Sequence, residues 1–213
     1  MKLILKDKKH LGKLITFCGL DGCGKTTMIG MLKKYLKEHN IIPVLTKQPT
    51  DAIRSSEIFR TYMDNPDHTS FDYRALSLSA AGDRIQHTDK YIVPLLESGN
   101  IVISDRYFYS CIANLKARGY MEDCWIYEIA SHIQKPDLSF FLDVDVDMAL
   151  KRVRSRENEK NKYVDVDLQH RLREQYLLIA KETGGTVISS NKEPDECFKE
   201  IMLHTERILM QYV

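Results

Sequence analysis

A nine-residue stretch, Gly19-Leu20-Asp21-Gly22-Cys23-Gly24-Lys25-Thr26-Thr27, constrains the fold of this chain more than any other segment. It fits the pattern G-x-x-x-x-G-K-[ST], in which the backbone N–H groups of a glycine-rich turn point inward at phosphate oxygens. A short apolar run over 14–18 precedes it, and an amphipathic helix pattern over 26–39 follows it. The alternative is an ordinary glycine turn between a strand and a helix. The complete match in this context favours a phosphate-binding loop.

Each part of that loop has an expected chemical role. Glycines let the backbone approach a phosphate closely. Lys25 can reach the β- and γ-phosphates of a nucleoside triphosphate, and the hydroxyl of Thr26 can bind Mg²⁺. The N-terminus of the next helix adds a favourable dipole. The candidate nucleotide-binding residues of the loop are therefore Gly19, Asp21, Gly22, Cys23, Gly24, Lys25, Thr26 and Thr27.

The bulk composition is that of one globular domain. The chain has 213 residues, 43% of them hydrophobic and 29% charged, which suffices for a full core. Its net charge of +1 favours neither nucleic acid nor an acidic membrane as a partner. The N-terminal apolar run is too short for a signal peptide, and no run is long enough to span a bilayer. We therefore expect a single cytoplasmic domain over 1–213, with no nucleic-acid or membrane partner.

The five cysteines, at positions 18, 23, 111, 124 and 197, have no C-x-x-C spacing. Neither a zinc site nor a disulfide framework is indicated. Cys23 differs from the others because a thiol near a helix N-terminus can have a lowered pKa. A small loop-filling role is the alternative, and it is the one favoured for Cys23.

Short apolar runs alternate with helical patterns along the whole chain. Strands are expected at 14–18, 42–46, 100–104, 138–143 and 186–189. Helices are expected near 26–39, 53–63, 71–97, 107–118, 121–133, 146–156, 167–182 and 194–211. Such alternation predicts a five-stranded parallel sheet covered on both faces, that is, a three-layer α/β/α sandwich. Ligands of such folds bind at the carboxyl ends of the strands.

The segment over 156–165 interrupts this alternation because it is charged and has no apolar face. One interpretation is a solvated loop between two helices. The other is a lid over the phosphates, spanning about 154–166, since Arg152, Arg154 and Arg156 form a cluster suited to phosphate charge.

A second group of candidate residues follows the expected strand 100–104. Asp105 stands where an acid can hold Mg²⁺ or its waters, and Arg106 can clamp a phosphate. A structural ion pair is the alternative. Arg84, inside the long helical pattern, can face a substrate or solvent. For Gln48-Pro49 an ordinary turn is expected, with a cis peptide as the alternative. Together, Arg106, Arg60 and Arg84 suggest a second phosphate site. A kinase needs such a site when its acceptor is itself phosphorylated.

The ordered set of these motifs resembles the thymidylate kinases, a family of nucleoside monophosphate kinases, over roughly 13–205. The marks are the loop 17–26, Thr46-Lys47-Gln48-Pro49, the stretch 81–87, Asp105-Arg106-Tyr107, Lys135-Pro136-Asp137-Leu138, Leu142-Asp143-Val144 and the arginine-bearing lid. The resemblance implies the fold of the P-loop nucleoside triphosphate hydrolases in its nucleoside monophosphate kinase form, with a lid. It also implies ATP and Mg²⁺ as cofactors and a homodimer.

On the donor side, the resemblance implies that Lys25 binds ATP phosphates, with Thr26 and Asp105 on the metal. Asn191 and Lys192 would lie near the adenine. Gly22 stands where one subclass of the family has an arginine. The lid arginines, chiefly Arg154 and Arg156, would then supply charge in the transition state.

On the acceptor side, the resemblance implies that Asp21 lies near the sugar 3′-hydroxyl, that Arg106 and Arg60 hold the phosphate, and that Arg84 contacts the base. Gln48 and Pro49 would line the same pocket. Three positions depart from the family pattern: Ala80 replaces an aromatic residue, Asn114 a tyrosine and Leu115 a glutamine. These changes predict a wider, less polar base pocket.

The expected function is ATP-dependent phosphorylation of a nucleoside monophosphate, dTMP first. The departures keep open a different or modified nucleotide, or a small metabolite, as acceptor. An alternative of another class is a nucleotide-binding switch that makes no product. Asp105, Arg106 and the lid argue against that alternative.

Overall fold

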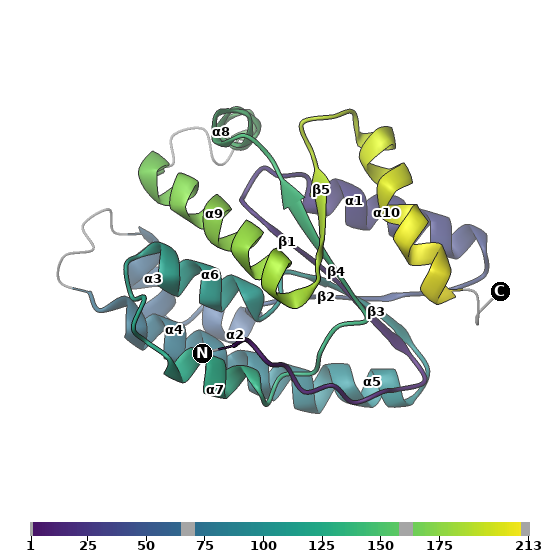
Figure 1. Ribbon diagram of the computed structural model, residues 1–213, viewed down its shortest axis with the longest axis horizontal. Coiled ribbons are helices and arrows are strands. Elements are labelled where there is room, and N and C mark those ends of the chain that lie inside the picture. Colours follow the sequence, from purple (N-terminus) through teal and green to yellow (C-terminus); the bar gives the residue numbers. More distant parts are fainter. Residues whose placement is uncertain (1, 65–70, 158–163, 210–213) are drawn as a thin grey trace.

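Five strands form a single parallel sheet in the order β2-β3-β1-β4-β5 (Figure 1). The structure is a computed structural model, and it describes residues 2–64, 71–157 and 164–209. The strands are β1 (Lys13–Gly19), β2 (Val44–Lys47), β3 (Ile101–Asp105), β4 (Leu138–Asp143) and β5 (Thr186–Ser189). The predicted five-stranded parallel sheet is confirmed: β4 and β5 have the predicted bounds, and the ends of β1, β2 and β3 are shifted by one or two residues.

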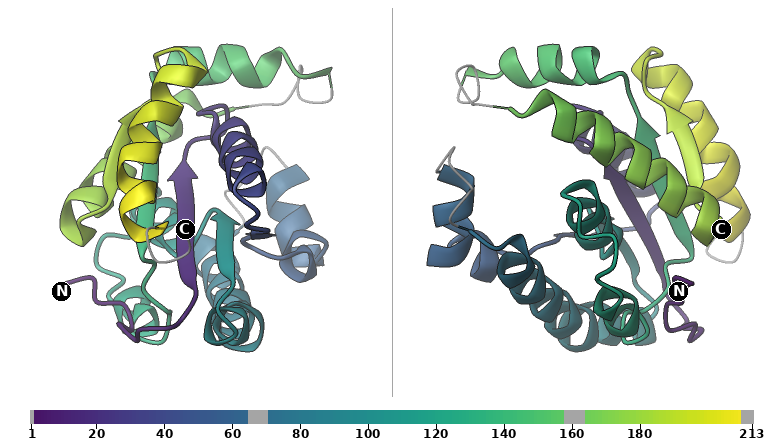
Figure 2. Two further views of the ribbon diagram at one scale, coloured as in Figure 1. Left: turned by 90° about the vertical axis from the view of Figure 1, so that its right-hand side faces the viewer. Right: turned by 60° about the vertical axis from the view of Figure 1, so that its left-hand side comes forward.

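Helices cover both faces of the sheet. They are α1 (Lys25–Glu38), α2 (Asp51–Arg54), α3 (Glu57–Asp64), α4 (Tyr73–His87), the π-helical turn η1 (Thr88–Ile92), α5 (Val93–Glu97), α6 (Tyr109–Ala117), α7 (Trp125–Ala130), α8 (Val146–Arg154), α9 (Val166–Thr183) and α10 (Pro194–Leu209). Helices α1 and α10 pack together on one face, and α6 and α9 on the other (Figure 2). The predicted three-layer sandwich is therefore confirmed.

The long helical pattern over 71–97 is one continuous helical path with a π turn in its middle. Pro94 lies in the first turn of α5, just after that turn. A proline inside a helix has no N–H to donate and clashes with the preceding turn, so a widened turn before it removes the conflict. The pattern over 53–63 instead breaks at Ser55-Ser56 into α2 and α3.

Apolar side chains on both faces of the central strands form the core. Phe17, Ile15 and Ile103 are completely buried, as is Phe140 on the neighbouring strand. The rings of Phe17 and Phe140 lie 5.2 Å apart. This packing fixes the strands in register, so that the carboxyl ends of β1, β3 and β4 meet at one edge.

None of the helices within the described ranges is long and apolar enough to cross a membrane.

Candidate active site

A cavity of about 1380 Å³ lies across the carboxyl ends of the strands. One end is formed by the glycine-rich loop between β1 and α1, together with α8. The other end lies between α3, α4 and α6, and Asp105 and Arg106 line the cavity as well. This position is the one predicted for a ligand of an open parallel sheet.

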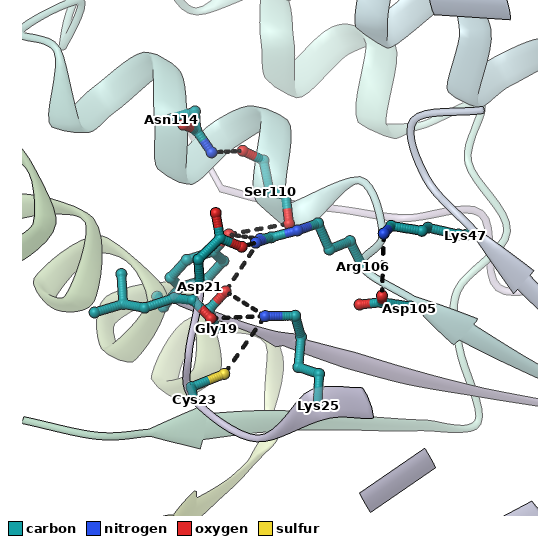
Figure 3. Close-up of polar contacts among 11 residues, drawn as sticks. Gly19, Asp21, Cys23, Lys25, Lys47, Asp105, Arg106, Ser110 and Asn114 are labelled. Atoms are coloured by element: carbon teal, nitrogen blue, oxygen red, sulfur yellow. Dashed lines mark hydrogen bonds and ion pairs between the residues drawn. The ribbon is translucent and has the colours of Figure 1, made fainter. Parts of the chain in front are cut away.

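The loop holds Lys25 tightly against its own backbone. Lys25 Nζ donates to the carbonyl oxygens of Leu20 at 2.7 Å and Gly19 at 3.2 Å, and it lies 3.5 Å from Cys23 Sγ (Figure 3). The lysine side chain is buried, yet it lines the cavity. Its charge is therefore placed inside the turn whose backbone N–H groups are expected to face phosphate oxygens.

Arg106 crosses from the end of β3 to this loop. Its Nη1 donates to the carbonyl oxygen of Gly19 at 3.0 Å and to the hydroxyl of Tyr176 at 3.1 Å, while Nη2 pairs with Asp21 (Figure 3). The backbone of Arg106 has a φ of 68°, a left-handed conformation that costs about 1–2 kcal/mol for a residue with a side chain. The backbone N–H of Arg106 donates to the carbonyl of Phe17 at 2.8 Å, which fixes the residue in that conformation.

The charge of Arg106 is well compensated. Burial by itself would lower the pKa of the guanidinium, but Asp21, Tyr176 and Asp105 outweigh it and raise that pKa. The group therefore stays a cation at any physiological pH, ready for an anionic ligand.

Asp105, the residue before Arg106 at the end of β3, is suited to hold a metal ion. Its Oδ2 lies 3.7 Å from Lys47 Nζ, whereas the buried Oδ1 has no hydrogen-bond partner among the described residues. Within those same ranges, no group of three or more His, Cys, Asp or Glu side chains is placed to hold a metal. A cation here would take few ligands from the protein, such as Asp105 and the exposed, cavity-lining Thr26. The remaining ligands would be phosphate and water, which is typical of Mg²⁺.

The far end of the cavity contains a buried cation. Arg84 on α4 is only 3% exposed, and its Nη1 donates to the carbonyl of Ala80 at 2.9 Å. Its Nε and the hydroxyl of Ser77, one to two turns away on the same helix, are buried without partners in the described part of the chain. Because unpaired buried polar groups are costly, they indicate a ligand that satisfies them.

Arg118, just after α6, forms another polar wall there. Its guanidinium carbon lies 4.1 Å from the ring centre of Tyr73, Nε donates to the hydroxyl of Tyr62 at 2.6 Å, and Nη1 donates to Asn114 Oδ1 at 2.8 Å. All four side chains line the cavity. This end of the cavity is therefore more polar than the substitutions at Ala80 and Leu115 predict.

The structure brings most of the predicted site residues to this cavity. Those that line it are Gly19, Asp21, Gly22, Cys23, Gly24, Lys25, Thr26, Thr27, Pro49, Arg60, Ala80, Arg84, Asp105, Arg106, Asn114, Arg156 and Lys192. The Gln48-Pro49 peptide bond is cis, which is one of the two forms considered above.

Four predicted residues do not line this cavity. Leu115 is completely buried, because the face of α6 toward the cavity carries Ser110, Cys111 and Asn114. Gln48 is also completely buried, and its amide contacts His87.

The other two residues, Arg154 and Asn191, have exposed side chains. Arg154 is exposed and does not line the cavity, whereas Arg152, two residues earlier, does. The amide of Asn191 binds the backbone N–H and carboxylate of Asp145 and does not line the cavity.

Sequence reasoning also missed Arg54, Ser77, Arg118 and Tyr176 as cavity-lining residues. Arg54 donates to the carbonyl of Pro49, and burial, reinforced by Arg106, lowers its pKa. The spacing of Ser110, Asn114 and Arg118 at intervals of four was the available signal, since such residues share one helix face. Tyr176 had no comparable signal, because its partners are distant in sequence.

Part of the expected lid lies outside the described residues, namely 158–163. On its two sides, Arg156, Val164 and Asp165 line the cavity. The lid itself therefore stays a prediction.

The sheet order, with a phosphate loop at the end of the central strand, defines a P-loop nucleoside monophosphate kinase fold. A family model described as thymidylate kinase matches residues 17–201, so the chain belongs to the thymidylate kinase family and is a phosphotransferase.

Several curated proteins are similar to this chain. A probable thymidylate kinase of Pyrococcus horikoshii is 36% identical over 80% of this chain and 83% of its own length. A probable thymidylate kinase of Staphylothermus marinus is 30% identical over 95% and 96%. The thymidylate kinase of Clostridium novyi is 32% identical over 89% and 96%.

Proposed function

We propose that this protein transfers the γ-phosphoryl group of MgATP to the phosphate of a nucleoside monophosphate, with dTMP as the first candidate. One observation carries the proposal: Arg106 lies between the phosphate loop and the basic far end of the same cavity, and it contacts the loop directly through Gly19 and Asp21. An enzyme that only hydrolyses a triphosphate needs the loop but not a second basic site.

The protein's part in this reaction is positioning and charge. Lys25 and the loop amides would hold the donor phosphates, while Arg106, Arg60 and Arg54 would reduce repulsion between two anionic substrates. Mg²⁺, bound through Thr26 and Asp105, would neutralise charge on the donor phosphates. Arg152 and Arg156 line the loop end of the cavity and would stabilise charge on the transferred group.

The sugar and base of the acceptor would occupy the far end of the cavity. Asp21, in the phosphate loop, would lie near a sugar hydroxyl, and Arg84 and Ser77 at the far end would hydrogen-bond the base. The names of the relatives support dTMP. Ala80 keeps a different or modified nucleotide as the second candidate, because a small residue at that position leaves the base without the expected aromatic partner.

A homodimer is part of the same proposal, because the family resemblance implies it. Sedimentation equilibrium of the purified protein would give the mass of the assembly directly.

The decisive experiment supplies MgATP with dTMP, dUMP, UMP, CMP, dCMP, GMP or AMP and follows ADP formation. We expect turnover of dTMP, and we expect Arg106→Ala to raise the acceptor KM and lower kcat. ATP binding without turnover of any acceptor would instead favour a nucleotide-binding switch. Unchanged kinetics in Arg106→Ala would contradict the role given to this arginine.

A further inference from the structure

Tyr176 on α9 connects three elements of the site through its hydroxyl group. The ring is 4% exposed and lines the cavity. Its oxygen accepts from Arg106 Nη1 at 3.1 Å, and its O–H donates to Ser110 Oγ at 3.0 Å. One side chain therefore joins α9, the N-terminal turn of α6 and the end of β3.

The direction of these hydrogen bonds follows from the number of protons. A guanidinium only donates, so the oxygen of Tyr176 must accept from Arg106. The phenol has one proton, which is then directed to Ser110. Burial raises the pKa of Tyr176 to about 12, although Arg106 opposes the shift. The hydroxyl therefore stays protonated at physiological pH, and the arrangement is the same throughout that range.

This contact determines which donors of Arg106 remain for a ligand. Nη1 has two N–H bonds, and the described contacts use both, one to Gly19 and one to Tyr176. Nη2 contributes one N–H to Asp21. The Nε–H and the second N–H of Nη2 have no hydrogen-bond partner among residues 2–64, 71–157 and 164–209, and two such donors suit bidentate binding of a phosphate.

The two side-chain partners of the guanidinium, Tyr176 and Asp21, differ in burial. Tyr176 is buried, whereas the Asp21 side chain is 61% exposed. Without the tyrosine hydroxyl, one N–H of Nη1 would lose its acceptor in a buried setting. The guanidinium would then be free to turn toward Asp21, and its remaining donors would no longer face one fixed point.

We propose that Tyr176 is a positioning residue that fixes the guanidinium of Arg106 for the acceptor phosphate. The inference rests on the proposed function, because it assigns the ligand of Arg106 as that phosphate. Tyr176 need not touch the substrate. Its effect would pass through Arg106 and would appear in acceptor kinetics rather than in ATP binding.

The test compares Tyr176→Phe with Tyr109→Phe. Tyr109 is also buried, and its hydroxyl is hydrogen-bonded to Ser139, but it does not contact Arg106 or line the cavity. Both variants lose one buried phenolic hydroxyl, so a general loss of stability should affect them alike. We expect Tyr176→Phe to raise the acceptor KM about tenfold or more with ATP KM within about twofold. Tyr109→Phe should change neither constant by more than about twofold.

A double-mutant cycle separates positioning from a purely structural effect. In an Arg106→Ala background, the Tyr176→Phe change should have no further effect on the acceptor KM, because its target is gone. If Tyr176→Phe does not fold, a 4-fluorophenylalanine at position 176 keeps the ring and fills the space of the hydroxyl, but its fluorine is a poor hydrogen-bond acceptor. The acceptor KM should then rise in that protein as well.

Failure of the inference about Tyr176 can be distinguished from failure of the proposed function. Equal acceptor kinetics in Tyr176→Phe and Tyr109→Phe, or full additivity with Arg106→Ala, would overturn the inference while the kinase activity stands. Absence of acceptor turnover by the wild-type protein would overturn the proposed function and the inference with it.

Discussion

Gly22 in the phosphate loop lies so close to the backbone of Ala149 in α8 that position 22 has no room for a side chain. A Cβ atom on Gly22 would lie 2.3 Å from the carbonyl oxygen of Ala149 and 3.1 Å from Val153 Cγ2. Helix α8 thus rests on the loop. Because an arginine at position 22 would clash with this helix, the close approach supports the proposal that Arg152 and Arg156 supply charge for the transferred phosphate.

A methyl group at Gly22 should therefore push α8 away from the loop. Gly22 and Gly24 both have positive φ, 83° and 93°, but a Cβ on Gly24 would meet nothing within 4 Å. Gly22→Ala and Gly24→Ala share the backbone strain, whereas only Gly22→Ala adds overpacking of about 1–3 kcal/mol. Thermal unfolding should show a melting temperature several degrees lower for Gly22→Ala. Equal melting temperatures in the two variants would show that α8 moves away from position 22 with no loss of stability.

Arg152 should contribute more to catalysis than Arg154. The Arg152 guanidinium lines the cavity and donates to the carbonyl oxygen of Ser190 at 2.9 Å, while Arg154 is exposed. We expect Arg152→Ala to lower kcat about 100-fold and Arg154→Ala to change it little. Steady-state ADP formation measures both, with circular dichroism as a check on folding. A larger loss of kcat in Arg154→Ala than in Arg152→Ala would instead favour Arg154 as the source of this charge.

Removal of the Asp105 charge should weaken the response to magnesium. The unpaired, buried Oδ1 is the observation behind this expectation. We expect Asp105→Asn to need about tenfold more Mg²⁺ for half-maximal ADP formation, because the variant loses one anionic ligand or water-holding group. Asp137→Asn is the control, since Asp137 binds the backbone of Leu14 at the opposite edge of the sheet. An unchanged magnesium titration in Asp105→Asn would reject the metal role.

Arg118 should affect the acceptor and not the donor. Its guanidinium lies on Tyr73 and is held by Tyr62 and Asn114. Arg118→Met keeps much of the side-chain volume and removes the charge, so the acceptor KM should rise about tenfold with ATP KM unchanged. Arg171→Met provides the comparison, because Arg171 is exposed, donates to the carbonyl of Ala117 and does not line the cavity. Matching acceptor KM values in both variants would refute this role.

His87 should make the protein less stable in mild acid. Its ring contacts Thr46 Oγ1 at 2.9 Å and Gln48 Nε2 at 3.0 Å. Burial, helped by Arg84 and opposed by Asp83, lowers the pKa of His87 below its ordinary value of 6.5. The unfolded chain therefore binds the proton more readily, so this stabilisation is complete above about pH 6.5 and is lost as pH falls through the lower folded value. The melting temperature should fall more between pH 7.5 and 5.5 in the wild type than in His87→Gln. A parallel fall in both proteins would exclude His87 as the cause.

Local patterns predicted the parts of the site that depend on the backbone. The loop residues, Asp105 and Arg106 follow directly after buried strands, and in a parallel sheet the ends of those strands lie at one edge. Their common location therefore follows from chain order alone. The left-handed conformation of Arg106 was not predictable, because it depends on the hydrogen bond from its N–H to Phe17 on the neighbouring strand.

The sequence did not indicate that the side chains of Leu115 and Arg154 lie outside the cavity. Each stands beside a residue that does line the cavity, Asn114 in one case and Val153 in the other. Adjacent helical residues point about 100° apart, so a shift of one position changes a side chain from the site to the core or to solvent. Which face of α6 or α8 meets the cavity depends on how that helix packs.

By itself, the sequence determined the parallel α/β/α sandwich, the phosphate loop and the Asp105-Arg106 pair, because these depend on periodicity and on order along the chain. Only the tertiary structure decided that Tyr176 holds Arg106, that Arg118 lies on Tyr73, and that α8 rests on Gly22. Those contacts join residues tens of positions apart. Their geometry is set by the packing of helices against the sheet, which no local pattern of residues records.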